Sequence, residues 1–479
     1  MAVLDRLEPN AVFRFFEELC AIPHGSGNTS AAADWLLRFA EARGLEHYRD
    51  GMNNVIIIGP AAPGCEAAPP VILQGHIDMV CEKDADCPLD MAKEGLSLAV
   101  EGDSVYARGT TLGGDDGIAV AMMLAILDDP ALPRPRVECV FTVDEEVGML
   151  GAQALDISPL RGRTMLNLDS EAEGIFTVSC AGGRCVSNTL PVARAPFEGA
   201  ALDLSVSGLS GGHSGMEINK GRANADILLG RVLRALQKAT DMRIIEVRGG
   251  LKDNAIPVLA EAQVVAADAS AAAEVCRDCE RMFRTEYAVT DPAVSVAVRP
   301  GEIAVPMDSE SSGRLIRFLL CAPNGVQAMS ADVEGLVETS LNLGILTTDE
   351  AAVRAVFSVR SSVESRKELL TDRLRCLTEG LGGSVELSGD YPAWAFRRES
   401  PLRDTMTAVF REQYGRDPVI DAIHAGLECG LFSGKLPGLD CVSIGPDLTD
   451  IHTPRERMSV ASVARTWALV REVLSRLGK

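Results

Sequence analysis

The chain has 479 residues, more than a single hydrophobic core usually serves, so two or more domains are expected. Hydrophobic residues make up 47% of the chain and charged residues 24%, which is the balance of a globular protein. The formal net charge of −22 is spread along the chain, which argues against binding to nucleic acid or to an anionic membrane surface.

The N-terminus and the cysteines indicate the compartment. The opening "MAVLDRLEPN" has neither the basic nor the apolar region of a signal peptide, and no apolar stretch approaches the roughly 18 residues of a membrane helix. The 13 cysteines are odd in number and irregularly spaced, which is typical of reduced thiols. We therefore expect a cytoplasmic protein. Cys276 and Cys279 form a CxxC inside a helical pattern with no second pair nearby, which favours packing over metal binding.

The first part of the chain, residues 1–184, alternates helical patterns with short apolar runs. Apolar runs of strand length without strict alternation indicate a buried, largely parallel sheet. The alternation as a whole predicts an α/β domain. The predicted helices cover residues 11–22, 29–44 and 117–129, and the predicted strands cover 53–59, 69–78 and 136–144.

A second pattern covers residues 185–392, where strands and helices alternate in the manner of an α+β domain. The first style then returns in residues 393–479, with a helix at 400–415, an apolar run at 438–446 and a final helix. We therefore predict a catalytic domain made of residues 1–184 and 393–479, with residues 185–392 as an inserted domain.

Histidines mark the candidate site. Four of the six stand beside glycine, an acid or proline at predicted strand ends or loops, namely His76, His213, His424 and His452. Such loops at the carboxyl ends of parallel strands are where α/β proteins place their sites. Asp78 follows His76 by two positions and so shares its face of an extended chain, where it can hydrogen-bond the imidazole. A strand that simply ends in a polar loop is the alternative.

Acidic residues occupy similar positions. Asp115 and Asp116 lie in a glycine-rich turn before a helix, where ordinary helix capping is the alternative. Asp169 ends a short apolar run, and the adjacent Glu145 and Glu146 follow another. Neighbours on an extended strand point to opposite faces, so both glutamates reach one site only if the chain turns there. Together with two histidines, these acids form a nitrogen and oxygen ligand set that suits zinc or manganese.

The order HxD, GxDDG, EE, a lone Asp and a distant C-terminal His resembles the co-catalytic di-zinc peptidases of the aminoacylase and carboxypeptidase-G2 type. Within that family it most resembles the branch of the aminoacyl-histidine dipeptidases (peptidase D, the cytosolic non-specific dipeptidases). The resemblance extends from about residue 20 to the C-terminus and implies an α/β catalytic domain with an inserted α+β lid that also dimerises. The supporting segments are "QGHIDMVCEK", "GTTLGGDDGIAVA", "DEEVGMLGA", "NLDSE", "SGLSGGHSGMEI", "NAIP", "HAGLECGLF" and "IHTPRERM".

The resemblance also implies roles. It makes Glu145 the general base and Asp78 the residue that orients His76, and it places a non-proline cis peptide between Asp115 and Asp116. The family more often has Asn after the bridging Asp, so Asp116 is a rival to Asp115, which we retain. Two divalent metals per subunit are expected, Zn²⁺ first, with Mn²⁺ or Co²⁺ as alternatives. Their ligands would be His76 and Asp169 for one metal, Glu146 and His452 for the other, and Asp115 between them.

For the substrate, the resemblance implies a dipeptide, including Xaa-His dipeptides such as β-alanyl-histidine. His213 would reach the site of the partner subunit in a homodimer and stabilise the oxyanion, and Arg360 would bind the substrate's C-terminal carboxylate. Asn254 and the loop at Gly426 would help to hold the substrate. The alternatives are a tripeptidase or an N-acyl amino-acid hydrolase of the same family, and a catalytically silent dimerisation scaffold, which would lack ligands that this chain has.

Overall fold

The computed structural model describes residues 2–479 and divides into two compact units. Unit 1 consists of the chain up to Ser179 together with Phe396–Ala422 and Leu427–Lys479, and unit 2 consists of Cys180–Ala395 and Ile423–Gly426. The predicted division placed Ile423–Gly426 in the second part of the catalytic domain, whereas the structure groups this short segment with unit 2.

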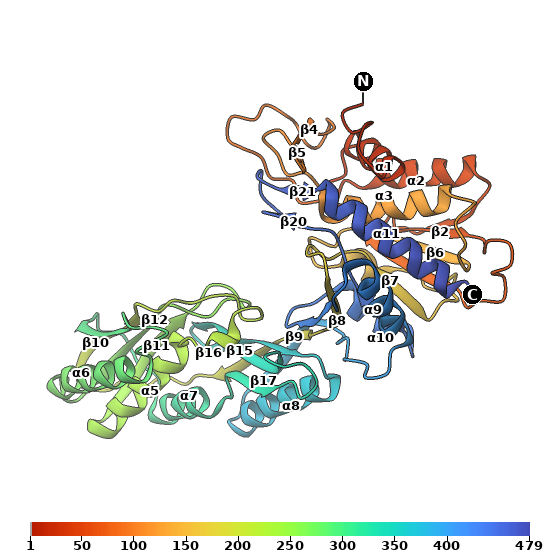
Figure 1. Ribbon diagram of the computed structural model, residues 1–479. Helices are drawn as coiled ribbons and strands as arrows, with labels where there is room; N and C mark the ends of the chain where they lie inside the picture. The colour runs from red at the N-terminus through yellow and green to blue at the C-terminus, as the bar shows by residue number, and fades with distance from the viewer. Residues whose placement is uncertain (1) are drawn as a thin grey trace. The chain divides into compact units, whose positions relative to one another are not determined.

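Unit 1 is built on a mixed sheet with strand order β1-β2-β6-β3-β7-β19-β8-β18 (Figure 1). Strands β6, β3, β7 and β19 run parallel in its middle, and all residues of β2, β3 and β6 are buried, which explains their continuous apolar runs. The strands are β1 (Glu46–Arg49), β2 (Val55–Gly59), β3 (Val71–His76), β6 (Val137–Thr142), β7 (Thr164–Asn167), β8 (Ile175–Cys180), β18 (Val419–Ile423) and β19 (Asp440–Ser443). A smaller sheet contains β4 (Leu98–Glu101), β5 (Ser104–Ala107), β20 (Leu448–Thr449) and β21 (Arg457–Ser459).

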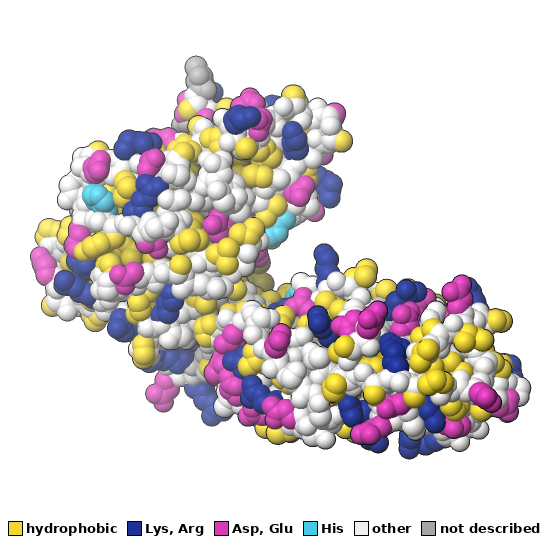
Figure 2. All heavy atoms as spheres, turned by 180° about the vertical axis from the view of Figure 1, so that it is seen from behind, with side chains coloured by type: hydrophobic (Ala, Val, Ile, Leu, Met, Phe, Trp, Pro, Cys, Tyr) yellow, Lys and Arg dark blue, Asp and Glu magenta, His cyan; other side chains and the backbone are white. Residues whose placement is uncertain are grey.

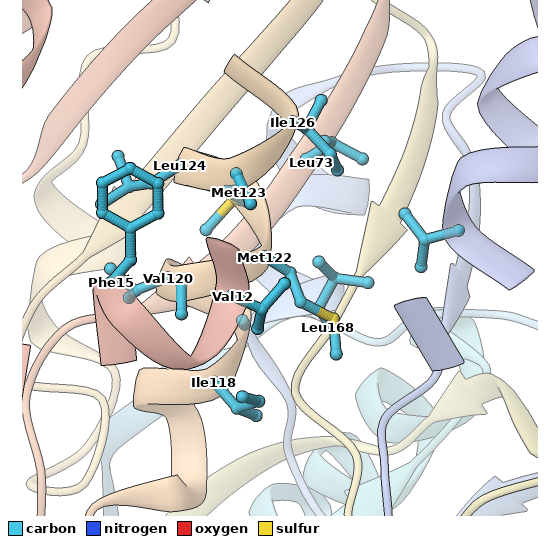
Figure 3. Packing of buried hydrophobic residues seen from close by; sticks show 14 of the residues in the cluster. Val12, Phe15, Leu73, Ile118, Val120, Met122, Met123, Leu124, Ile126 and Leu168 are labelled. Atoms are coloured by element: carbon cyan, nitrogen blue, oxygen red, sulfur yellow. The ribbon is translucent and has the colours of Figure 1, made fainter. Parts of the chain in front are cut away.

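The helices of unit 1 pack around this sheet. Helix α3 is buried from Gly114 to Leu127, and α1 packs directly against it. Figure 3 shows how Val12 and Phe15 of α1 meet the apolar side chains of α3, with Leu73 of β3 and Leu168 in the same cluster. The core therefore fixes α3, and with it the turn that precedes α3. The helices are α1 (Asn10–Cys20), α2 (Ser30–Ala42), α3 (Gly114–Asp128), α4 (Leu150–Ala154), α9 (Pro401–Tyr414), α10 (Glu428–Lys435) and α11 (Val460–Leu477).

Unit 2 has an antiparallel sheet with strand order β13-β10-β12-β11-β15-β16-β9-β17, and β14 pairs with β15. Helices α5–α8 lie along one face of this sheet in Figure 1 and share its apolar core. The strands are β9 (Gly182–Pro191), β10 (Ala200–Ser207), β11 (Met242–Gly249), β12 (Ala260–Ala266), β13 (Ser295–Pro300), β14 (Gly325–Met329), β15 (Val337–Thr348), β16 (Ala352–Ser361) and β17 (Ser384–Tyr391). The helices are η1 (Ile218–Lys220), α5 (Ala225–Ala239), α6 (Ala269–Glu286), α7 (Ser309–Cys321) and α8 (Glu364–Gly380).

The surface charge and the CxxC pair both match the expectations from the sequence. Acidic and basic side chains are interspersed on the face drawn in Figure 2. Cys276 and Cys279 are buried in α6 as part of the apolar core of unit 2, which accounts for the CxxC by packing. In residues 2–479, none of the helices has both the length and the apolar character needed to cross a membrane.

Candidate metal centre

The candidate ligands lie where adjacent parallel strands of unit 1 end. His76 is the last residue of β3, which lies between β6 and β7. Asp169 follows β7 by two residues, and Glu145 follows β6 by three. Because the carboxyl ends of parallel strands share one edge of the sheet, three separate chain segments deliver polar side chains to one place.

A turn after β6 brings the two adjacent glutamates to the same site. Asp144 has a φ of 53°, and the carbonyl of Glu145 accepts hydrogen bonds from the N–H groups of Gly148 and Met149. The chain therefore leaves the extended conformation at Asp144. As a result, ligand atoms of His76, Glu145 and Glu146 all lie within 4.8 Å of one another.

The glycine-rich turn before α3 places Asp115 between two histidines. Gly113 has a φ of 68°, which favours glycine, and the Asp115–Asp116 peptide bond is cis, as predicted. One carboxylate oxygen of Asp115 lies 3.1 Å from His76 Nε2, and the other lies 3.2 Å from His452 Nε2. Asp116 instead accepts a hydrogen bond from the backbone N–H of His76 at 3.2 Å. Ligand atoms of Asp116, His76 and Asp169 also lie within 4.8 Å of one another. Of the two aspartates, however, only Asp115 contacts the imidazoles of both His76 and His452.

The spacing of these side chains fits metal ligation. Zn–N and Zn–O bonds of about 2.0–2.1 Å in a tetrahedral site separate neighbouring donor atoms by about 3.3–3.4 Å. In addition to the two Asp115 contacts, His76 Nε2 lies 3.6 Å from Asp169 Oδ1, and His452 Nε2 lies 3.0 Å from Glu146 Oε1. The five predicted ligands thus form one chain of contacts, in which Asp115 lies between His76, which also contacts Asp169, and His452, which also contacts Glu146.

The charge of the cluster also fits a cation. Hydrogen bonds with Asp115 and Glu146 raise the pKa of His452 to about 10. Burial raises the pKa of Asp169 well above its usual range, and the charge of Asp116 raises it further. In residues 2–479 the ion pairs of these acids are with His76 and His452, and none is with lysine or arginine. The site therefore has an excess of buried carboxylates that divalent cations would compensate.

Asp78 connects His76 to Glu145. The Nδ1 atom of His76 lies 2.8 Å from the backbone carbonyl oxygen of Asp78 and 3.5 Å from its carboxylate. An N–H at Nδ1 that donates to this carbonyl leaves Nε2 free to face the acids. The carboxylate of Asp78 accepts from the backbone N–H of Glu145 at 3.2 Å and from the hydroxyl of Ser26 at 2.8 Å. The predicted orienting residue thus acts on His76 mainly through its main chain, and its side chain holds Glu145.

Glu145 has the environment of a proton-transfer residue. Burial, together with the nearby carboxylates of Glu428, Glu146 and Asp115, raises its pKa to about 8, although His76 opposes this shift. Glu428 is fully buried and accepts hydrogen bonds from Thr142 and Gln74. A carboxylate whose pKa lies near neutrality is suited to accept and return a proton.

The predicted substrate residues lie in unit 2. Arg360 is 9% exposed and donates to the hydroxyl of Tyr391 at 3.0 Å, and none of the described residues accepts a hydrogen bond from its Nε atom. Burial and the charge of Arg360 together lower the pKa of His424 to about 3, and the same two effects lower the pKa of His213. His424 Nε2 also lies 2.7 Å from Ser340 Oγ. Unit 2 therefore contains a buried cation beside two neutral imidazoles.

The other two predicted substrate residues occupy loops of unit 2. The carbonyl of Asn254 accepts from the backbone N–H of Ser214, next to His213, and the Asn254 side chain is exposed. Gly426 belongs to the short Ile423–Gly426 segment that also carries His424.

The sequence patterns missed several residues that touch the site. Ser26 lies in a small polar loop and gives no signal of its contact with Asp78. His24 lies outside the four histidine motifs, yet it is 2% exposed, and the charge of Asp78 acts on its imidazole. Glu456 accepts hydrogen bonds from the turn that carries Asp115, and its only signal is its place four residues after His452.

The fold and the cluster of candidate metal ligands together indicate a metallopeptidase. The sequence profile of peptidase family M20/M25/M40 matches residues 72–476, so the chain belongs to this family. It is 35% identical over 484 residues to the cytosol non-specific dipeptidase of Escherichia coli (strain K12), covering 100% of this chain and 99% of that protein. The crystal structure of aminoacylhistidine dipeptidase from Vibrio alginolyticus superimposes with a TM-score of 0.93 at 36% identity, covering 99% of this chain and 98% of that chain.

A more distant structure shares the fold. Aminopeptidase PepT from Bacillus cereus matches with a TM-score of 0.58 at 16% identity, covering 99% of this chain and 100% of that chain. The predicted family and the predicted fold class are therefore confirmed.

Proposed function

We propose that this protein is a metal-dependent dipeptidase that hydrolyses Xaa-His and other dipeptides in the cytoplasm. The observation that carries the proposal is the carboxylate of Asp115, whose two oxygens face His76 and His452, with Glu145 and Glu146 beside them. Two relatives with 35% and 36% identity over nearly the full chain, both named as dipeptidases, support the same activity.

The residues that would hold two metals are His76 and Asp169 on one side, Glu146 and His452 on the other, and Asp115 between them. Bound divalent cations would polarise the scissile carbonyl and lower the pKa of an attacking water. The set consists of imidazole and carboxylate groups, which fits Zn²⁺ and also Mn²⁺ or Co²⁺. Asp78 would hold His76 and Glu145 in position relative to each other, through its backbone carbonyl and its carboxylate respectively.

Glu145 would be the general base. It accepts a proton from the water as the oxygen of that water bonds to the peptide carbon. It then gives this proton to the nitrogen as the C–N bond breaks, so that a free carboxylate and a free amine are released. The raised pKa of Glu145 supports this role, because the group can hold a proton briefly and release it near neutral pH.

Unit 2 would supply the groups that bind the substrate. Arg360 would pair with the C-terminal carboxylate of the dipeptide, because a guanidinium with an unpartnered donor is suited to a bidentate carboxylate. His213 would donate to the oxyanion as a neutral imidazole, and its lowered pKa supports that state. Asn254 and Gly426 would line the same substrate site.

We also propose that unit 2 acts as a lid and forms a homodimer. Leu251 is 94% exposed and, with Val258 and Leu259, lines an apolar groove of unit 2. Exposed apolar groups gathered in one patch are typical of protein–protein contacts. Analytical ultracentrifugation of the wild type and of Leu251→Lys tests this, with a dimer expected for the former and monomers for the latter.

The decisive experiment is to strip the protein of metal and to measure hydrolysis after adding back Zn²⁺, Mn²⁺ or Co²⁺. The substrates are β-alanyl-histidine, other dipeptides, tripeptides and N-acyl amino acids. We expect metal-dependent cleavage of dipeptides with a free amine. Preferred cleavage of tripeptides or of acylated substrates would favour the alternative activities, and no hydrolysis with any metal would overturn the proposal.

A further inference from the structure

A buried carboxylate outside the ligand set holds the turn that carries Asp115. Glu456 is 2% exposed. Its Oε2 accepts from the backbone N–H groups of Leu112 and Gly113 at 2.7 and 3.1 Å, and its Oε1 accepts from Gly114 and Asp115 at 2.8 and 3.4 Å. One side chain therefore binds four successive backbone donors.

The turn is shaped around this carboxylate. Successive N–H groups that point to one side of a turn form a concave site for an anion. Gly113 adopts a φ of 68°, and a Cβ at Gly114 would lie 3.2 Å from Glu456 Oε1 and 2.8 Å from Leu448 Cδ2. The two glycines thus allow the backbone to approach Glu456 closely, and the anion that fills the site belongs to the protein itself.

Glu456 also belongs to the segment that carries His452. The N–H of Glu456 donates to the carbonyl of Thr453 at 3.0 Å, and the Thr453 hydroxyl donates to the carbonyl of Asp450 at 2.8 Å. These bonds make residues 450–456 a compact turn in which His452 has a φ of 60°. His452 itself is 44% exposed, so packing alone does little to hold its side chain.

We propose that Glu456 is a positioning residue that fixes the separation of Asp115 and His452 and thereby the affinity of the site for the metal they share. The inference rests on the proposed metal centre. Among the described residues, the Glu456 carboxylate forms its hydrogen bonds with the backbone of the Asp115 turn and not with the imidazole of His452 or the carboxylate of Asp115. It joins the two backbone segments from which these side chains project. Loss of this link would let the ligands drift apart without removing either of them.

The test compares Glu456→Gln and Glu456→Asp with the wild-type full-length chain. Gln turns an N–H₂ group toward backbone donors, and Asp keeps the charge but is one methylene too short to reach all four. Each metal-free protein is titrated with Zn²⁺ alone. We expect the affinity for one of the two Zn²⁺ ions to be about 10–100-fold lower in Glu456→Gln than in the wild type, with a smaller loss in Glu456→Asp. The visible absorption spectrum of the Co²⁺-loaded protein should change in both variants.

Glu138→Gln is the matched control. Glu138 is also fully buried and accepts from the backbone N–H groups of Arg161 and Gly162 at 2.8 and 2.9 Å, but it lies near the start of β6, at the opposite end from Thr142 and the site. Its replacement should lower thermal stability and leave Zn²⁺ affinity and the Co²⁺ spectrum unchanged.

The outcomes separate the two proposals. Wild-type affinity and an unchanged Co²⁺ spectrum in both Glu456 variants would overturn the positioning role, and so would unfolding of both variants while Glu138→Gln stays folded. A wild-type protein that binds no divalent metal would instead overturn the proposed function. Weaker binding in Glu456→Gln than in Glu138→Gln supports the inference.

Discussion

The two units bury polar clusters of opposite character. In unit 1, Asp115 and Asp116 lie with other acids around two histidines, and no lysine or arginine forms an ion pair with them within residues 2–479. In unit 2, Arg360 lies near two imidazoles whose pKa values are lowered. Burial of unbalanced charge is costly, so each cluster indicates a ligand of opposite sign. The first suits divalent cations and the second suits a carboxylate, which are the two components that a metallodipeptidase must bind.

The largest expected effect distinguishes the two adjacent glutamates of unit 1. Glu145→Gln should lower kcat for a dipeptide by about 10²–10⁴-fold, because an amide cannot accept the proton from water. The variant should still contain two metals per chain by elemental analysis. Glu146→Gln should instead lose metal together with activity, because Glu146 contacts His452. An active Glu145→Gln variant would remove Glu145 from the role of base.

The next comparison tests which aspartate of the glycine-rich turn binds both metals. Asp115→Asn should weaken Zn²⁺ binding by about 100-fold or more, because both oxygens of Asp115 face histidines of the proposed metal centre. Asp116→Asn should weaken it by less than about 10-fold, since Asp116 hydrogen-bonds the backbone of His76. Calorimetric titration of each metal-free variant measures the difference, and the reverse order of effects would make Asp116 the bridging ligand.

The strands of unit 1 follow from local sequence patterns, whereas the orientation of the site residues depends on turns and loop contacts. Continuous apolar runs predicted the buried strands β2, β3 and β6, and the polar residues that follow β3 and β6 therefore marked the site. The expectation of parallel pairing holds for β3 with β6, whereas β2 pairs antiparallel with both of its neighbours. The direction in which the Glu145 and Glu146 side chains point depends on the positive φ of Asp144, which no local sequence pattern predicts. The contact of Glu456 with Leu112 joins residues 344 positions apart and arises only when two loops pack together. Local periodicity therefore predicts the helices, the strands and the strand ends, but it does not predict contacts between loops that are far apart in the sequence.

A smaller effect is expected for the cation of unit 2. Arg360→Met should raise KM for a dipeptide by about 10–100-fold, because it removes the partner of the C-terminal carboxylate. A dipeptide amide, which lacks that charge, should be cleaved equally by the variant and the wild type. Arg354→Met is the control on the same strand, since Arg354 is largely exposed and pairs loosely with Asp349 at 3.7 Å. An equal loss for the amide and for the free dipeptide would contradict a carboxylate-binding role.

The smallest effect concerns stability and contrasts a solitary buried acid with the clustered acids of unit 1. Asp226 of α5 is fully buried, neither of its carboxylate oxygens has a hydrogen-bond partner within residues 2–479, and burial raises its pKa to about 8. The folded chain therefore keeps a proton that the unfolded chain releases near pH 4, so the free energy of unfolding should fall as pH rises from about 4 to about 8 and then level off.

Asp226→Asn removes this titration while keeping the shape of the side chain. Urea unfolding at pH 5.5 and pH 8.0 measures the free energy of unfolding of both proteins. The difference between the variant and the wild type should shift by about 1–3 kcal/mol in favour of the variant from the lower to the higher pH. Glu274→Gln, an exposed change in α6 of the same unit, should leave the pH dependence as it is in the wild type. An Asp226→Asn variant with the wild-type pH dependence would mean that Asp226 is ionised in the folded state. Unit 2 would then stabilise a buried carboxylate without histidines or metal, and an excess of buried acids in unit 1 would no longer by itself indicate a bound cation.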